Sequence, residues 1–387
     1  MDFNRVIDRK GTGCYKWDYL TQFFGDDTIL PMTVADMDFA VPEPIVQALQ
    51  DRLAHPVFGY TGQQPSYWEA IAQWMEERHG WPIPTDWLID IPGVIPAMHF
   101  CIQAFTQPDD KVLVQTPVYD PFFQAIQRNG RSLAISQLVY QNGRYLMDWE
   151  DLERQFRGGV KMMILCSPHN PVGRVWAREE LTRLITLAEQ YGVWLISDEI
   201  HHDIVFPGHN HHILGKVADG YDRIVTLTSP AKTFNIQGLQ CAAVILPDEA
   251  HRKAFKAQKF KAGLYLSNTL SMIAYEAAYR HGGPWVDALV EYLDGNRQYL
   301  REAFAESDAI DLIYPDGTYV AWLDCRPMQL DSLALKDYFV QEAKVGLNKG
   351  VVYGQDGDGF MRINFALPRP QLKEAVEQIR IAAEKTM

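Results

Sequence analysis

Short apolar runs alternate with amphipathic helical stretches through the middle of the chain. The runs have the length of strands and turn-like flanks, and they lie at 111–116, 161–167, 193–198, 223–228 and 241–246. Between two of them, residues 177–192 repeat apolar residues at helical spacing on one face, namely Leu181, Leu184, Ile185 and Ala188. Strands that are apolar throughout are buried on both faces, so their alternation with helices predicts an α/β fold with a mostly parallel, doubly wound sheet.

The two ends of the chain differ from this middle. The first residues are rich in Gly and Pro, whereas a long helical pattern over 284–306 leads into further strand-like runs and a last helix. This texture predicts an N-terminal arm over 1–45 that contributes to a small domain. It also predicts a large domain over 46–285 and a small C-terminal α+β domain over 286–387.

Composition excludes several classes of protein. The chain has 387 residues, 47% of them hydrophobic, and a net charge of −13, which argues against a nucleic-acid or anionic-membrane partner. Its five cysteines are scattered and form no CxxC pair, a pattern that fits a reducing compartment. The polar N-terminus has no apolar core of a signal peptide, and the apolar runs are too short to span a bilayer. We therefore expect a cytoplasmic protein.

Two residues at strand ends indicate chemistry. Lys232 follows the run 223–228 among small and polar residues, and a desolvated lysine forms Schiff bases readily. Asp198 ends the run 193–198, at the edge of the sheet where α/β proteins bind ligands. Pyridoxal phosphate (PLP) needs such a carboxylate against its ring nitrogen. Alone, a lysine is more often solvated, and an aspartate at a strand end more often caps a helix.

Three further signals lie at the same predicted edge. Asn170 follows one strand and can donate to a phenolic oxygen, while Tyr119 follows another and can stack on a planar ring. Gly93 opens a helical pattern with Val94 and Ile95 in its first turn, and the N–H groups at a helix N-terminus form a phosphate site. These signals agree on one crevice.

A family resemblance extends this interpretation. In order, the chain contains GVIPAM, TPVYDPF, SPHNPVGRVW, SDEIHHD, SPAKTFN and RINFALPR, and this series resembles the fold-type-I PLP enzymes of the class I/II aminotransferase superfamily. More narrowly, LPMTVADMDFAVPEP, HPVFGYTG, SPHNPVGRVW and SDEIHHD resemble the MalY/PatB-type cystathionine β-lyases, which are C–S lyases. The likeness covers nearly the whole chain and implies a large domain with a seven-stranded type of sheet.

The resemblance implies roles for the residues at the cofactor ring. Lys232 would bind PLP as a Schiff base and later act as the base on the substrate Cα–H. Asp198 would pair with the ring nitrogen, and Asn170, helped by His201, would hydrogen-bond the phenolic oxygen. Tyr119 would stack on the ring and, with Lys232, is expected to be catalytic.

The resemblance also implies how the phosphate and the substrate are held. Ser229, together with the backbone of Gly93, Val94 and Ile95, would bind the phosphate. Tyr60 would reach the phosphate in the neighbouring subunit, which implies a homodimer. The substrate carboxylate would lie on two further residues, Arg362 as a bidentate partner and the backbone at Ala35.

Two reactions remain open for this set of residues. In a C–S lyase the thiol group leaves from the β-carbon, so that cystathionine, cysteine or a cysteine S-conjugate gives a thiol, pyruvate and ammonia. An aminotransferase uses the same Lys, Asp, Asn and Arg. Aspartate aminotransferases carry a phosphate-binding arginine shortly after the lysine, and residues 233–243 contain none, which favours the lyase.

Two other interpretations concern metals and partners. Five histidines near the predicted site could hold a metal ion: His201, His202, His209, His211 and His212. They lack HExxH spacing, and a solvated histidine-rich loop is the more common explanation, so we expect no metal. Some members of the resembled type bind a transcription regulator, which implies such a partner as an additional role.

Overall fold

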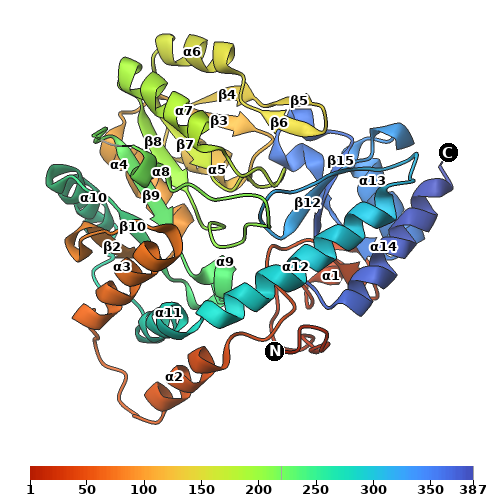
Figure 1. Cartoon of the computed structure of the whole chain (residues 1–387), viewed down its shortest axis with the longest axis horizontal. Coiled ribbons are helices and arrows are strands. Elements are labelled where there is room, and N and C mark those ends of the chain that lie inside the picture. The colour runs from red at the N-terminus through yellow and green to blue at the C-terminus, as the bar shows by residue number, and fades with distance from the viewer. Residues whose placement is uncertain (219, 387) are drawn as a thin grey trace.

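A seven-stranded sheet forms the centre of the larger part of the molecule in the computed structural model, which describes residues 1–218 and 220–386 (Figure 1). Its strand order is β2-β10-β9-β8-β7-β3-β4. The strands are β2 (Leu88–Ile91), β3 (Lys111–Thr116), β4 (Ser132–Gln137), β7 (Val160–Cys166), β8 (Trp194–Asp198), β9 (Ile224–Thr228) and β10 (Ala242–Ile245). Only β10 runs against its neighbours, and all other pairs that we describe in this sheet are parallel.

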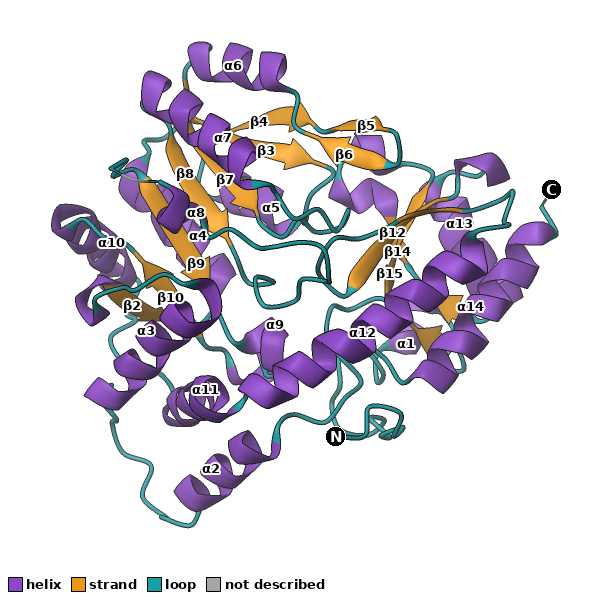
Figure 2. Ribbon diagram, viewed as in Figure 1, coloured by secondary structure: helices purple, strands orange, loops and turns teal. Residues whose placement is uncertain are grey.

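Helices cover both faces of this sheet (Figure 2). One face packs against α4 (Val94–Phe105), α5 (Pro121–Arg128) and α10 (Glu249–Lys261). The other packs against α6 (Trp149–Arg157), α7 (Arg178–Tyr191) and α8 (Leu214–Val217). Helix α7 ends where Gly192 adopts φ 67°, a left-handed conformation that glycine takes without a steric cost. Helices α2 (Glu43–Leu53), α3 (Pro65–His79), α9 (Ala231–Phe234) and α11 (Thr269–His281) complete this part.

A second, four-stranded antiparallel sheet organises the C-terminal part, in the order β11-β12-β15-β14. Its strands are β11 (Asp311–Ile313), β12 (Val320–Asp324), β14 (Asn348–Lys349) and β15 (Phe360–Asn364). The long α12 (Gly283–Phe304) and α14 (Arg369–Glu384) pack together beside it (Figure 1), and α13 (Ser332–Tyr338) lies near β14 and β15. A small hairpin, β5 (Val139–Gln141) and β6 (Arg144–Leu146), extends from the large sheet.

The N-terminal residues lie against the C-terminal part. After the short α1 (Leu20–Phe24), β1 (Leu30–Pro31) pairs in parallel with β13 (Val345–Gly346), and the backbone of Asn364 donates to Met32. The predicted boundary at residues 285/286 falls inside the first turn of α12. The domain limits themselves remain a prediction.

The α/β class and the mostly parallel seven-stranded sheet are confirmed. All the apolar runs predicted as strands of this sheet form strands, whereas β2 and β4 were not predicted. In the described part of the chain, no helix is both long enough and apolar enough to cross a membrane.

Candidate active site

A cavity of about 610 Å³ opens at the carboxyl ends of the parallel strands, beside the small sheet. The structure brings all the predicted site residues except Tyr60 to its wall: Ala35, Gly93, Val94, Ile95, Tyr119, Asn170, Asp198, His201, Ser229, Lys232 and Arg362. Tyr60 lies elsewhere, on the loop between α2 and α3, and its side chain is 100% exposed. The crevice predicted from the strand ends is therefore a single pocket.

The amine of Lys232 points to the backbone of the N-terminal segment. Lys232 lies in the short helix α9 directly after β9, and its Nζ donates a hydrogen bond to the carbonyl of Ala35. Tyr319 donates to the same carbonyl at 2.8 Å. Burial lowers the pKa of Lys232 to about 8, although the carboxylate of Asp36 opposes this shift. At pH 7 about a tenth of the amine is then uncharged and nucleophilic, far more than for an ordinary lysine.

Asp198 is buried at the last position of β8. Burial raises the pKa of its carboxyl group to about 7, and a hydrogen bond from the backbone of Ile200 at 3.2 Å acts in the opposite direction. A cationic ring nitrogen beside this carboxylate would stabilise its charged form. The position therefore suits a partner that carries a proton on nitrogen.

His201 and Asn170 are both buried beside these two groups. Burial and the nearby Lys232 keep the pKa of His201 well below its usual value, so the imidazole is neutral. The side-chain oxygen of Asn170 accepts a hydrogen bond from Arg362 at 3.3 Å. This contact orients the amide and turns its NH₂ group to other acceptors.

Arg362 is 3% exposed on β15 and carries a charge with no carboxylate partner among the described residues. Its Nη2 donates to the carbonyl of Thr33 at 2.6 Å and to the side chain of Asn348 at 2.8 Å. Its Nε is buried without any hydrogen-bond acceptor. Because an unpaired buried charge is costly, this guanidinium is a strong site for a ligand carboxylate.

The predicted phosphate end of the pocket offers free backbone donors. The N-terminus of α4 begins after Gly93, which has no side chain to satisfy the first N–H groups. The Ser229 hydroxyl donates to the carbonyl of Cys241 at 2.5 Å, so its hydrogen is already used within the protein. Gln237 and Gln240 also line the pocket, and the side chain of Gln237 lies beside the hydroxyl of Tyr319. No strand-end pattern in the sequence indicates either glutamine.

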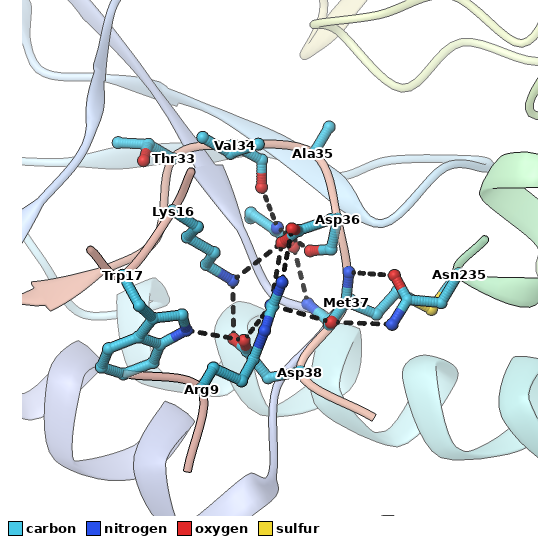
Figure 3. Close-up of polar contacts among 12 residues, drawn as sticks. Arg9, Lys16, Trp17, Thr33, Val34, Ala35, Asp36, Met37, Asp38 and Asn235 are labelled. Carbon is cyan, nitrogen blue, oxygen red and sulfur yellow. Dashed lines mark hydrogen bonds and ion pairs between the residues drawn. The ribbon is translucent and has the colours of Figure 1, made fainter. Parts of the chain in front are cut away.

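The pocket shares a wall with the segment from Thr33 to Asp38, which we call the strap (Figure 3). The strap is held from both parts of the molecule. On the side of Lys232, Asn235 accepts from the Met37 backbone at 2.9 Å and donates to the same residue at 2.9 Å. On the side of Arg362, Asn364 donates to the carbonyls of Val34 and Asp36, each at 2.7 Å.

Ion pairs fix the strap from its outer side (Figure 3). Arg9 binds Asp36 at 2.7 Å and Asp38 at 2.6 Å. Lys16, which is 1% exposed, binds Asp38 at 2.6 Å, and Trp17 donates to the same carboxylate at 2.9 Å. No strand pattern marks this stretch, and sequence reasoning assigned a role to Ala35 alone.

The histidine-rich segment differs from the solvated loop that the sequence favoured. His201 and His202 are buried, and His211 bonds Glu199 at 2.8 Å. With His79 and Asp203, His202 forms a group whose possible metal-ligating atoms lie within 4.8 Å of one another. Four protein groups already surround the Asp203 carboxylate, at 2.7–3.2 Å: His79, Trp74, Thr233 and His202. The segment is therefore a buried polar network behind the pocket.

This fold and site define the class of protein. The chain belongs to the aminotransferase class I and II family, whose sequence profile matches residues 27–379.

Within that family, the chain belongs with the C–S lyases. It is 40% identical to cystathionine β-lyase PatB of Bacillus subtilis, with 99% of this chain and 100% of PatB covered. It is 38% identical to the protein MalY of Escherichia coli, with 97% of each covered. Among solved structures, cystalysin from Treponema denticola, which contains PLP, superposes with a TM-score of 0.95 at 34% identity, covering 100% of this chain and 99% of cystalysin.

Proposed function

We propose that this chain is a PLP-dependent C–S β-lyase that cleaves cystathionine, cysteine or cysteine S-conjugates to a thiol, pyruvate and ammonia. One observation carries the proposal: the pocket combines a lysine amine whose pKa is lowered to about 8 with a buried, unpaired arginine. The first suits a carbonyl cofactor and a proton transfer, and the second suits an amino-acid carboxylate. Membership of the C–S lyase group supports the same reaction.

The residues of the pocket fit PLP at each of its functional groups. Lys232 would bind the aldehyde as a Schiff base, Asp198 would hold the ring nitrogen and Tyr119 would cover the ring face. The free N–H groups at the start of α4 would hold the phosphate. When bound, PLP supplies an electron sink that stabilises negative charge at the substrate Cα.

The chain's own residues supply binding and proton transfer. Arg362 binds the α-carboxylate and so fixes the position of the substrate Cα. Once the substrate amino group has displaced it from the cofactor, the freed Lys232 amine would take the Cα proton onto Nζ, and the Cβ–S bond would break with its electron pair leaving on the sulfur. The thiolate takes up a proton, and water completes the conversion of the remaining fragment to pyruvate and ammonia.

The experiment mixes the purified PLP-loaded protein with cystathionine in the absence of any keto acid and follows thiol and pyruvate together. We expect equal, catalytic release of both, and we expect Lys232→Ala to lose at least about a thousandfold in rate because it lacks the base. Absence of release, with cofactor absorbance that bleaches and returns on addition of a keto acid, would instead establish an aminotransferase.

We also propose that the enzyme is a homodimer in which Tyr60 serves the neighbouring subunit. Tyr60 cannot serve its own pocket in the described arrangement, because it lies on an exposed loop outside the pocket wall. Other apolar side chains of the same region are exposed too: Leu53, Val57 and Phe58. A surface of this kind is typical of a protein interface.

A further inference from the structure

Four charged side chains line the pocket among the described residues: Asp120, Asp198, Lys232 and Arg362. In the proposed reaction, the last three have roles that are the same for every amino-acid substrate. Asp198 faces the cofactor ring, Lys232 handles the aldehyde and the Cα proton, and Arg362 binds the α-carboxylate. Asp120 has no part in that scheme.

Local structure does not explain Asp120. It is the N-cap residue of α5, a position where aspartate usually accepts a backbone N–H, yet its side chain makes no capping hydrogen bond. The one side-chain group that binds its carboxylate is Gln124, whose Nε2 donates to Oδ2 at 3.0 Å. Asp120 forms no ion pair within the described part of the chain, not even with Arg362.

The surroundings of Asp120 suit a cation. Its side chain is half-buried, and this partial loss of water raises the pKa of the carboxyl group, while the hydrogen bond from Gln124 and the charge of the nearby Arg362 act in the opposite direction. The nearby pocket wall comes from Tyr119, Val352 and Tyr353, which present aromatic and aliphatic surface. An alkyl chain can lie along such a wall while an ammonium at its end reaches the carboxylate.

We propose that Asp120 is a specificity residue that binds a cationic group on the leaving thiol. This inference rests on the proposed lyase function. The cofactor and Arg362 already account for the α-amino and α-carboxylate groups of the substrate. The substituent on sulfur is therefore the part that a further pocket residue can recognise. The favoured class is cysteine thioethers whose S-alkyl chain ends in a primary ammonium, and thioethers that end in a carboxylate are repelled.

The test compares three synthetic cysteine thioethers, of which the aminoethyl and propyl compounds are matched in size. S-(2-aminoethyl)-L-cysteine, S-propyl-L-cysteine and S-(2-carboxyethyl)-L-cysteine differ in the charge at the chain end. We expect kcat/KM for pyruvate release to favour the aminoethyl over the propyl compound by about tenfold, as a partly desolvated ion pair provides. In Asp120→Asn, which keeps the shape and an acceptor for Gln124, this ratio falls to near one and the carboxyethyl compound improves.

A charge-matched control removes one carboxylate from an exposed position of α14, as Glu374→Gln, and leaves the ratio as in the native enzyme. Equal losses on all three substrates in Asp120→Asn would show a purely structural role and overturn the inference. Cleavage of the propyl compound without preference for the aminoethyl compound would also overturn it, while leaving the lyase function intact. If none of the three releases pyruvate while cystathionine does, only this inference fails; if cystathionine also releases none, the lyase proposal fails as well.

Discussion

The pKa values of Lys232 and Asp198 are shifted in opposite directions for the same reason. Burial disfavours a charge of either sign, so the pKa of Lys232 falls to about 8 while that of Asp198 rises to about 7. Each group therefore changes its charge close to neutral pH in the pocket without a cofactor. A ligand that brings an aldehyde and a protonated ring nitrogen relieves both costs at once.

The lowered pKa of Lys232 predicts how the cofactor-free protein captures PLP. Only the uncharged amine attacks an aldehyde, so the capture rate should rise as pH increases through about 8. Asp36→Asn should move this midpoint to lower pH, because the Asp36 carboxylate favours the protonated amine. The measurement is the rate of Schiff-base absorbance after mixing with PLP. A midpoint near the ordinary lysine value of about 10.4 would contradict it.

Which residues could be found from sequence follows from their positions. Asp198 ends a strand of the mostly parallel sheet, and Lys232, Asn170 and Tyr119 each follow one; the carboxyl ends of such strands meet at one edge. Arg362 comes from an antiparallel strand of the other sheet, and only the family resemblance indicated its role. The place of Gln237 on the pocket wall could not be foreseen, because no strand end marks its position and only three-dimensional packing brings it there.

At the level of elements, the strap illustrates what periodicity cannot show. Residues 33–38 form no long helix or strand, and their backbone groups are bound by side chains from distant segments. The missed strands have a similar explanation. Half-exposed β4 lies at the sheet edge and alternates in burial, whereas β2 carries the buried Asp90 in a short run. A search for continuous apolar runs passes over both.

The ion pairs of the strap predict a large loss of stability for Asp38→Asn. This change leaves the buried ammonium of Lys16 with only Asp36, at 3.7 Å, and should cost about 3–5 kcal/mol of unfolding free energy. Chemical denaturation of the PLP-loaded protein measures it. The control Asp287→Asn, which breaks the exposed pair with Arg78, should change the midpoint much less.

Acid should remove the stabilisation that the ion pairs of Asp38 give the native protein. Burial alone would raise the pKa of Asp38, but Lys16, Trp17 and Arg9 lower it below the ordinary value of an aspartate. A depressed pKa in the folded state means that the stabilisation is complete above the unfolded value and is lost as pH falls below it. The native protein should therefore lose stability below about pH 4 more steeply than Asp38→Asn does.

At the scale of the whole molecule, the loop between α2 and α3 projects away from the rest of the chain (Figure 1). It carries Tyr60, and the exposed Leu53 lies at the end of α2 just before it. One chain therefore holds the pocket and, away from it, the exposed tyrosine that we propose serves the neighbouring subunit. A symmetric pair of chains would give each pocket the other chain's tyrosine.

Subunit mixing tests this arrangement. Lys232→Ala and Tyr60→Ala are each expected to be impaired as pure proteins. Their equal mixture should regain about a quarter of the native activity, because random exchange makes about half of the dimers hybrid and each hybrid has one native site. The control mixes Lys232→Ala with native protein and should give about half. No gain in the first mixture would mean that Tyr60 does not act across the interface.

The double attachment of the strap has a stereochemical consequence. Asn235 ties it to the segment of Lys232, and Asn364 ties it to the strand of Arg362, so the base and the carboxylate site keep a fixed relation. With the cofactor plane as a third reference, the pocket is chiral around the substrate Cα. Of two mirror-image amino acids bound by the same carboxylate, only one can turn its Cα hydrogen toward Lys232. The strap thereby contributes to the choice of the enantiomer that reacts.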